Sequence, residues 1–65
     1  MNALYTRLKA ERGLTDYRIA QDTGVSRSTL SEWNAGQYIP KADKLLKIAR
    51  YLNVSIEDLL EAESK

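Results

Sequence analysis

Residues 19–36 read IAQDTGVSRSTLSEWNAG, and this stretch decides how the chain folds. Gly24 interrupts it after a short segment, and Gly36 ends it. Glycine adopts a positive φ without steric cost, so it commonly ends a helix in a tight turn. Ser26 follows the first glycine at a position where its hydroxyl can cap a second helix. The stretch therefore predicts two short helices joined by a tight turn.

Three further helices are predicted around this central pair. Residues 2–12 place Leu4 and Leu8 on one face, and Gly13 follows as a residue suited to the end of a helix. The clearest periodicity lies in residues 41–52, where apolar residues recur at the helical spacing i, i+3, i+4 and i+7. No stretch alternates apolar and polar residues over the length of a strand. We therefore expect an all-α fold of five helices, over about residues 2–12, 16–23, 27–34, 41–52 and 55–60.

Composition limits the chemistry that this chain can perform. Its 65 residues suffice for one small domain, which we expect to span residues 1–65 with a core at 2–61 and a frayed tail at 62–65. The chain has no cysteine and no histidine, which removes the usual ligands of zinc and the usual bases of catalysis. No apolar run approaches the roughly 20 residues that span a bilayer. We expect a cytoplasmic protein that is not an enzyme and that has no metal, no cofactor, no small-molecule ligand and no membrane attachment.

Charge is unevenly distributed along the chain, although the net charge is only +1. Residues 37–53 hold four basic side chains and one acidic side chain, whereas residues 54–65 hold four acidic and one basic. The acidic block would repel a polyanion, and the other blocks are able to face one. Ordinary solvated helix faces explain the same charges, so charge alone does not decide between these two interpretations.

The helix predicted at residues 27–34 has one apolar side and one polar side. At about 100° per residue, Leu30 and Trp33 share the first side and define the buried face. The other side carries hydroxyls, a carboxylate and a guanidinium. Such polar groups suit the major groove of DNA, where arginine pairs with guanine, glutamate accepts from cytosine and serine serves either role. A plain polar surface helix is the alternative interpretation. The polar side presents short hydroxyls, a carboxylate and a guanidinium, from Arg27, Ser28, Ser31 and Glu32.

The aromatic residues also admit two interpretations. Trp33 could stack on a nucleic-acid base, as in single-strand binders, but its place beside Leu30 favours the core. Tyr5, Tyr38 and Tyr51 are expected at the surface or half buried, and Tyr38 is the tyrosine best placed to meet a phosphate.

Apolar residues, glycines, a proline and short polar residues follow one another along the chain in a particular order and spacing. They are Leu4 and Leu8, Gly13 to Thr15, Ile19 and Ala20, Gly24 to Ser26, Leu30, Trp33, Gly36, Pro40, Leu45, Ile48 and Ala49, Leu52 to Ser55, and Leu59. In this order and spacing the chain resembles the phage-repressor-like helix-turn-helix domains, the group that includes Cro and the lambda repressor and is also called the XRE family. The resemblance covers nearly all of residues 2–61 without a gap.

The resemblance implies a compact five-helix domain in which the second and third helices form a DNA-binding motif. By position, it implies base-reading roles for Arg27, Ser28 and Glu32, to which the polar side of the helix adds Ser31. The start of the second helix and the loop after the third correspond to sites that contact phosphates. The candidate phosphate contacts are Tyr17, Arg18, Ser26, Thr29, Asn34, Gln37, Tyr38 and Lys41.

Three departures from the family pattern concern the grip on the DNA backbone. Many members have a glutamate where this chain has Asn34, paired with a cation on the first helix, and Lys9 cannot form that ion pair with an amide. The amide is expected to donate to a phosphate instead. Asp16 stands where a neutral amide often contacts phosphate, so we expect it to serve only the helix dipole. The loop at residues 37–39 is less basic than in many members, and together the three departures predict modest non-specific affinity.

Together these features predict a sequence-specific regulator of transcription, most simply a repressor, that binds double-stranded DNA as a homodimer on a pseudo-palindromic operator. Leu59 and Leu60 on the last helix are the candidate dimer contacts, and the competing interpretation is that this helix merely closes the core. The alternative is a protein-interaction module on the same scaffold, such as an antitoxin-type regulator. Failure to bind any duplex, together with tight binding of a protein partner, would favour that alternative.

Overall fold

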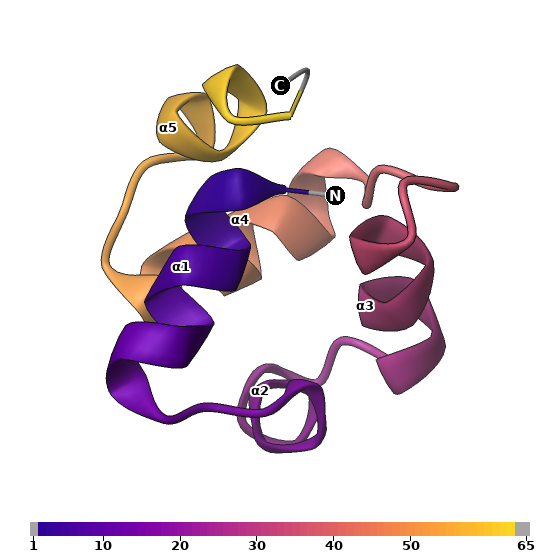
Figure 1. The fold of residues 1–65 in the computed structure, drawn as a ribbon. Helices are drawn as coiled ribbons and strands as arrows, with labels where there is room; N and C mark the ends of the chain where they lie inside the picture. The colour runs from indigo at the N-terminus through magenta and orange to yellow at the C-terminus, as the bar shows by residue number, and fades with distance from the viewer. Residues whose placement is uncertain (1, 64–65) are drawn as a thin grey trace.

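The computed structural model describes residues 2–63, which form five helices and no strand. The sequence prediction of an all-α fold is confirmed, and the helix limits agree with it within a residue or two. In chain order the helices are α1 (Ala3–Arg12), α2 (Asp16–Thr23), α3 (Arg27–Asn34), α4 (Ala42–Leu52) and α5 (Ile56–Glu61) (Figure 1).

Short polar side chains and left-handed residues set the ends of the helices. At four helix starts a side chain accepts the backbone N–H three residues on, which satisfies a donor that has no partner inside the helix. These caps are Asn2, Thr15, Ser26 and Ser55. Gly13, Gly24 and Asn53 end α1, α2 and α4 in the left-handed conformation.

The helices surround one apolar core. Figure 1 shows α1 in the centre with α4 behind it, α2 below, α3 to one side and α5 above. The guanidinium of Arg12 donates to the backbone oxygen of Leu52 at 2.8 Å, which ties the end of α1 to the end of α4. The core consists of Tyr5, Leu8, Ile19, Val25, Leu30, Trp33, Leu45, Ile48, Ala49, Leu52 and Leu59.

Tyr5 corrects the expectation that it lies at the surface or half buried. Its side chain is fully buried against Trp33, with ring centroids 4.7 Å apart and a tilt of 36°. A phenol can be buried at low cost when its hydroxyl finds an acceptor, and this hydroxyl donates to Asp16 at 2.8 Å. Trp33 is confirmed as a core residue, so it is not available to stack on a base.

The apolar side of α5 also differs from the expectation for dimer contacts. Leu59 is fully buried in the core and cannot contact a second molecule, whereas Leu60 is 46% exposed. Successive residues on a helix are turned by about 100°, so the helix that buries Leu59 against α1 turns Leu60 outward.

The C-terminal residues are attached as far as Glu63, where the sequence predicts fraying from residue 62. The Glu63 carboxylate accepts from the Nδ2 of Asn2 at 2.7 Å and from the Nε1 of Trp33 at 2.8 Å. The Asn2 amide is buried and also donates to the backbone oxygen of Leu59. A carboxylate that satisfies two such donors is held in place. Residues 64–65 of the predicted frayed tail lie outside the described residues.

Gly24 provides a test of the turn between α2 and α3. Its φ is +80°, and a Cβ added there would meet nothing within 4 Å. Gly24→Ala should therefore lower the free energy of unfolding by the backbone strain alone, about 1–2 kcal/mol. Urea unfolding followed by the fluorescence of Trp33 measures it.

Gly24→Asn is the matched control, because asparagine tolerates the left-handed conformation better than alanine does. It should cost less than Gly24→Ala. Equal costs for the two variants would contradict the conformational explanation.

Candidate nucleic-acid interface

The outer side of α3 is polar and open. Leu30 and Trp33 are both 0% exposed, which confirms the predicted orientation of the helix. All four candidate base-reading residues are exposed and, with Asp16, line a single hollow of about 510 Å³. They are Arg27, Ser28, Ser31 and Glu32. A guanidinium, two hydroxyls and a carboxylate therefore face one space, and their contact with bases stays a prediction.

The first turn of α3 is held by two hydroxyls. The Oγ of Ser26 accepts the backbone N–H of Thr29 at 3.1 Å, and the Ser26 hydroxyl donates to the Oγ1 of Thr29 at 2.8 Å. This cap fixes the direction in which Arg27 and Ser28 leave the helix. The contacts of both hydroxyls with phosphate remain predictions.

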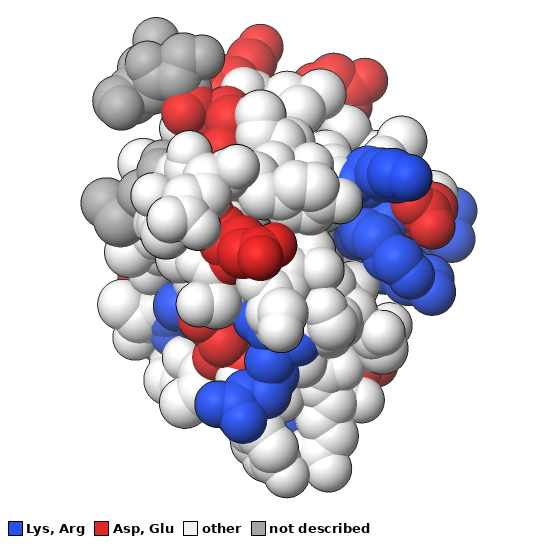
Figure 2. Space-filling view, turned by 90° about the vertical axis from the view of Figure 1, so that its right-hand side faces the viewer, with Lys and Arg blue, Asp and Glu red and all other residues white. Residues whose placement is uncertain are grey.

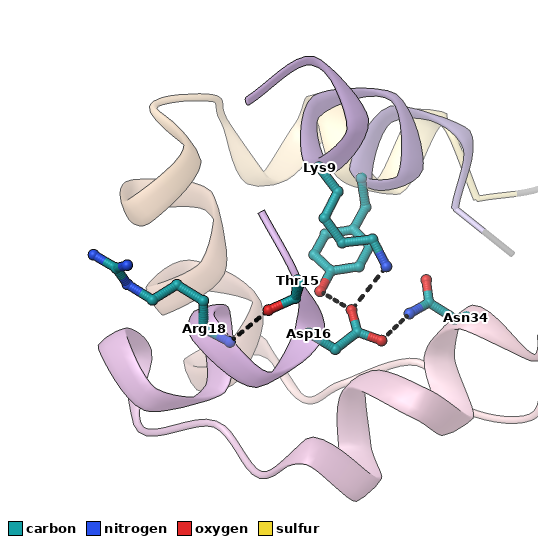
Figure 3. Close-up of polar contacts among 6 residues, drawn as sticks. Lys9, Thr15, Asp16, Arg18 and Asn34 are labelled. Carbon is teal, nitrogen blue, oxygen red and sulfur yellow. Dashed lines mark hydrogen bonds and ion pairs between the residues drawn. The ribbon is translucent and has the colours of Figure 1, made fainter. Parts of the chain in front are cut away.

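The carboxylate of Asp16 joins three helices (Figure 3). Its Oδ1 accepts from the Tyr5 hydroxyl at 2.8 Å and from the Lys9 Nζ at 2.9 Å, both on α1. Its Oδ2 accepts from the Nδ2 of Asn34 on α3 at 3.0 Å. The Lys9 ammonium also lies 5.1 Å from the centre of the Tyr5 ring. We call these four residues, Tyr5, Lys9, Asp16 and Asn34, the Asp16 network.

The Asp16 network corrects the prediction that Asp16 serves only the helix dipole. As the sequence predicts, Lys9 forms no ion pair with Asn34, and the carboxylate for Lys9 comes from α2 instead. Asn34 then donates to the same carboxylate, so one of its amide N–H groups is already engaged. An acid at position 16 together with an amide at position 34 is the sequence signal that could have indicated that Lys9 pairs with Asp16 and not with residue 34.

The network shifts the pKa values of two of its members. Burial alone raises the pKa of Asp16, but hydrogen bonds from Lys9, Tyr5 and Asn34 and the charge of Lys9 outweigh burial and hold it below its usual value. Burial, followed by the hydrogen bond to Asp16 and the charge of that carboxylate, raises the pKa of Tyr5. Asp16 is therefore ionised and Tyr5 neutral at physiological pH.

A second polar cluster joins α2 to α4. The Asp22 carboxylate accepts from the Nε of Arg18 at 2.8 Å and from the hydroxyl of Tyr51 at 2.5 Å. These bonds, that of Tyr51 first, lower the pKa of Asp22, and Asp22 in turn raises the pKa of Arg18 and Tyr51. Arg18 is thus engaged by a carboxylate, and its contact with phosphate stays a prediction.

The loop after α3 places polar side chains beside the same surface. Gln37, Tyr38 and Lys41 are all exposed, as the predicted phosphate contacts require. Figure 2 views the side of the molecule on which α3 lies. Basic side chains gather at its right edge, at the height of α4, and at a second place lower down, while acidic ones lie along the top and between the two basic groups.

Arg27 and Tyr17 are in contact across the turn. The guanidinium carbon of Arg27 lies 5.4 Å from the centre of the Tyr17 ring, a cation–π geometry. Sequence reasoning assigned these residues separate roles, one to a base and one to a phosphate, and missed the contact between them.

Within residues 2–63, no group of three or more acidic side chains is placed to hold a metal ion. None of the helices in this range has the length and apolar character needed to cross a membrane.

Comparison with known proteins gives a family and three relatives. Residues 4–59 match the family model described as helix-turn-helix. The chain is 31% identical over 62 residues to the HTH-type transcriptional activator BcrR of Enterococcus faecalis, covering 95% of this chain and 30% of that protein. It is 39% identical over 51 residues to an uncharacterized HTH-type transcriptional regulator of Archaeoglobus fulgidus, covering 78% of this chain and 73% of the relative.

A third relative is the uncharacterized HTH-type transcriptional regulator MJ0272 of Methanocaldococcus jannaschii, 37% identical over 51 residues, or 78% of this chain and 77% of the relative. This chain thus spans less than a third of the relative from Enterococcus faecalis and about three quarters of the other two. No solved structure matches the chain significantly.

Asp16→Asn tests the network. The substitution removes the charge that faces Lys9, so we expect the free energy of unfolding at neutral pH to fall by about 1–3 kcal/mol. Because the folded-state pKa of Asp16 lies below its unfolded value of about 3.9, this stabilisation is complete above that pH and is lost as pH falls through the folded pKa. Urea unfolding at a series of pH values measures both effects.

Asp22→Asn is the control for the Asp16 prediction. Asp22 accepts hydrogen bonds from Arg18 and Tyr51 and also has a lowered pKa, but its charged partner Arg18 has a side chain that is 63% exposed, against 22% for Lys9. The Asp22→Asn variant should lose much less free energy of unfolding than Asp16→Asn, since exposed ion pairs contribute little. A loss as large as that of Asp16→Asn would contradict a special role for the Asp16 network.

Proposed function

This chain belongs to the helix-turn-helix family, and we propose that it is a sequence-specific DNA-binding regulator of transcription that inserts α3 into the major groove of double-stranded DNA. One observation carries the proposal. The outer side of α3 directs Arg27, Ser28, Ser31 and Glu32 into one open hollow, while its inner side is locked into the core by Leu30 and Trp33.

The chemistry of this face suits base edges. The major groove admits an α-helix, and each base pair presents a distinct pattern of donors and acceptors there. Arg27 would donate to the O6 and N7 of guanine, Glu32 would accept from the N4 of cytosine, and Ser28 and Ser31 can donate or accept. The short serines let the helix approach the groove floor. The proposed role is binding rather than catalysis.

The residues around α3 supply the proposed grip on the backbone. The first turns of α2 and α3 and the following loop carry hydroxyl, amide and cationic groups, which would fix the register on the duplex. Few of them are free cations, since Arg18 is paired with Asp22. The proposed phosphate contacts are Tyr17, Arg18, Ser26, Thr29, Asn34, Gln37, Tyr38 and Lys41.

We also propose that the chain acts as a homodimer and represses transcription. Leu60 is 46% exposed on α5, and an apolar groove of about 620 Å³ between α1 and α5 has Arg7 on α1 opposite Asp58 and Glu61 on α5. A second copy related by two-fold symmetry would set each basic group against an acidic one. Repression rests on the resemblance to repressor domains, and transcription from a bound operator measured with and without the protein tests it.

Selection from a random duplex library tests the proposal directly. Enrichment of a palindrome, with half-sites about one helical turn apart, is the expected result. Arg27→Ala should then relax the preference at one base position and weaken binding of the selected site by about 1–3 kcal/mol, a factor of roughly 5 to 150. Fluorescence anisotropy with matched duplexes measures both changes.

Lys41→Ala is the contrasting variant. Lys41 is exposed and is proposed to contact a phosphate, so its loss should weaken binding to all sequences alike and reduce the slope of log K against log salt by about 0.9.

If no sequence is enriched by the unmodified chain, the proposal fails and the protein-interaction module takes its place. If Arg27→Ala retains the full base preference, its base contact is contradicted.

Leu60→Glu tests the proposed dimer. A buried charge at the centre of a two-fold interface has no partner, so the variant should be monomeric at concentrations where the unmodified chain is dimeric. Sedimentation equilibrium, with and without operator DNA, measures the assembly. Leu46→Glu is the matched control, since Leu46 is 39% exposed but lies on α4 and not on α5, and it should leave the assembly unchanged. Identical behaviour of the two variants would contradict the proposed interface.

A further inference from the structure

The contact between Arg27 and Tyr17 has features that a core contact does not have. Tyr17 is 58% exposed, and within residues 2–63 its hydroxyl has no hydrogen-bond partner. The ring therefore contributes little to the core. It stands in the first turn of α2, beside the start of α3, with its centre 5.4 Å from the guanidinium carbon of Arg27.

The Asp16 carboxylate does not compete for Arg27. Asp16 lines the same hollow as Arg27, and a free carboxylate there would pair with the guanidinium and cover its donors. The Oδ1 of Asp16 instead accepts from Tyr5 and Lys9, and its Oδ2 accepts from Asn34. None of the ion pairs formed within residues 2–63 includes Arg27. Its N–H groups are left for another acceptor, and Tyr17 supports the group from one side.

Support from a ring and readout of a base use different parts of a guanidinium. The ring attracts the flat face, while the N–H donors point outward in the plane and are needed for the O6 and N7 of guanine. An arginine already held in one orientation also loses less side-chain freedom on binding. The contact thus prepares Arg27 for a bidentate bond without using the atoms that make it.

We propose that Tyr17 is a specificity-determining positioning residue, whose ring holds the guanidinium of Arg27 so that it reads a guanine in the major groove. The inference rests on the proposed function and deepens it, because it names the base and the residue that supports its recognition. It also assigns the Tyr17 ring a role distinct from a phosphate contact made by its hydroxyl.

The test compares Tyr17→Leu and Tyr17→Phe. The readout is the ratio of affinities for a selected duplex and the same duplex with adenine in place of the guanine at the position that Arg27→Ala affects. Tyr17→Leu should lower this ratio about two- to fivefold, the effect of losing one exposed cation–π contact. Tyr17→Phe keeps the ring and should retain the ratio, even where loss of the hydroxyl weakens binding to both duplexes.

Tyr38→Leu is the matched control. Tyr38 is an exposed tyrosine in the loop after α3, 40% exposed, and its loss should change the affinity for both duplexes equally and leave the ratio unchanged. A second measurement needs no DNA. The δ-methylene protons of Arg27 should show an upfield ring-current shift in the NMR spectrum that is kept in Tyr17→Phe and lost in Tyr17→Leu.

The outcomes separate this inference from the proposed function. If the unmodified chain selects no duplex, the proposed function fails and takes this inference with it. If the chain selects a site and Arg27→Ala loses the guanine preference, but Tyr17→Leu keeps it, only the inference is overturned. It is equally overturned if Tyr17→Phe lowers the ratio as much as Tyr17→Leu, because the hydroxyl would then be the responsible group.

Discussion

The carboxylate of Asp16 is the interaction on which the arrangement of the first three helices depends. It accepts from two donors on α1 and one on α3, so the helix that carries it is tied to both neighbours by charge-assisted bonds. The Tyr5 hydroxyl is one of those donors, and its ring packs on Trp33 of α3. The polar network and the aromatic core therefore act on the same helix, and both hold α3 with its polar side outward.

The network also has a consequence for the surface. A carboxylate beside a DNA-binding helix would repel phosphates and attract the arginine that is needed for a base. Because Lys9, Tyr5 and Asn34 satisfy the Asp16 oxygens, the negative charge is balanced and Arg27 is left to the ring of Tyr17. The acid that departs from the family pattern thus replaces the missing ion pair of Asn34 and need not weaken the surface beside it. The acidic side chains of α5 lie at the other end of the molecule, where the proposed second copy and not DNA would meet them.

The parts of the fold that the sequence predicted correctly are all local. Gly24 and Ser26 mark the turn within a few residues of each other, and Leu30 and Trp33 lie three residues apart on one helix. The predictions that failed needed the position of a distant helix. Tyr5 was expected at the surface or half buried because its partner Asp16 lies on another helix. Leu59 was a candidate dimer contact because the sequence does not tell which of two adjacent leucines α5 buries.

By itself the sequence determined the number and limits of the helices, their caps and the buried side of α3, because helical period, capping and left-handed turns depend on neighbours within about four residues. Only the tertiary structure decided which polar groups meet. The bonds from Lys9 to Asp16, from Asn34 to Asp16 and from Asn2 to Glu63 join residues 7, 18 and 61 positions apart. Such pairs form only when packed helices bring a donor within about 3 Å of an acceptor, and that distance is set by the core and not by the local sequence.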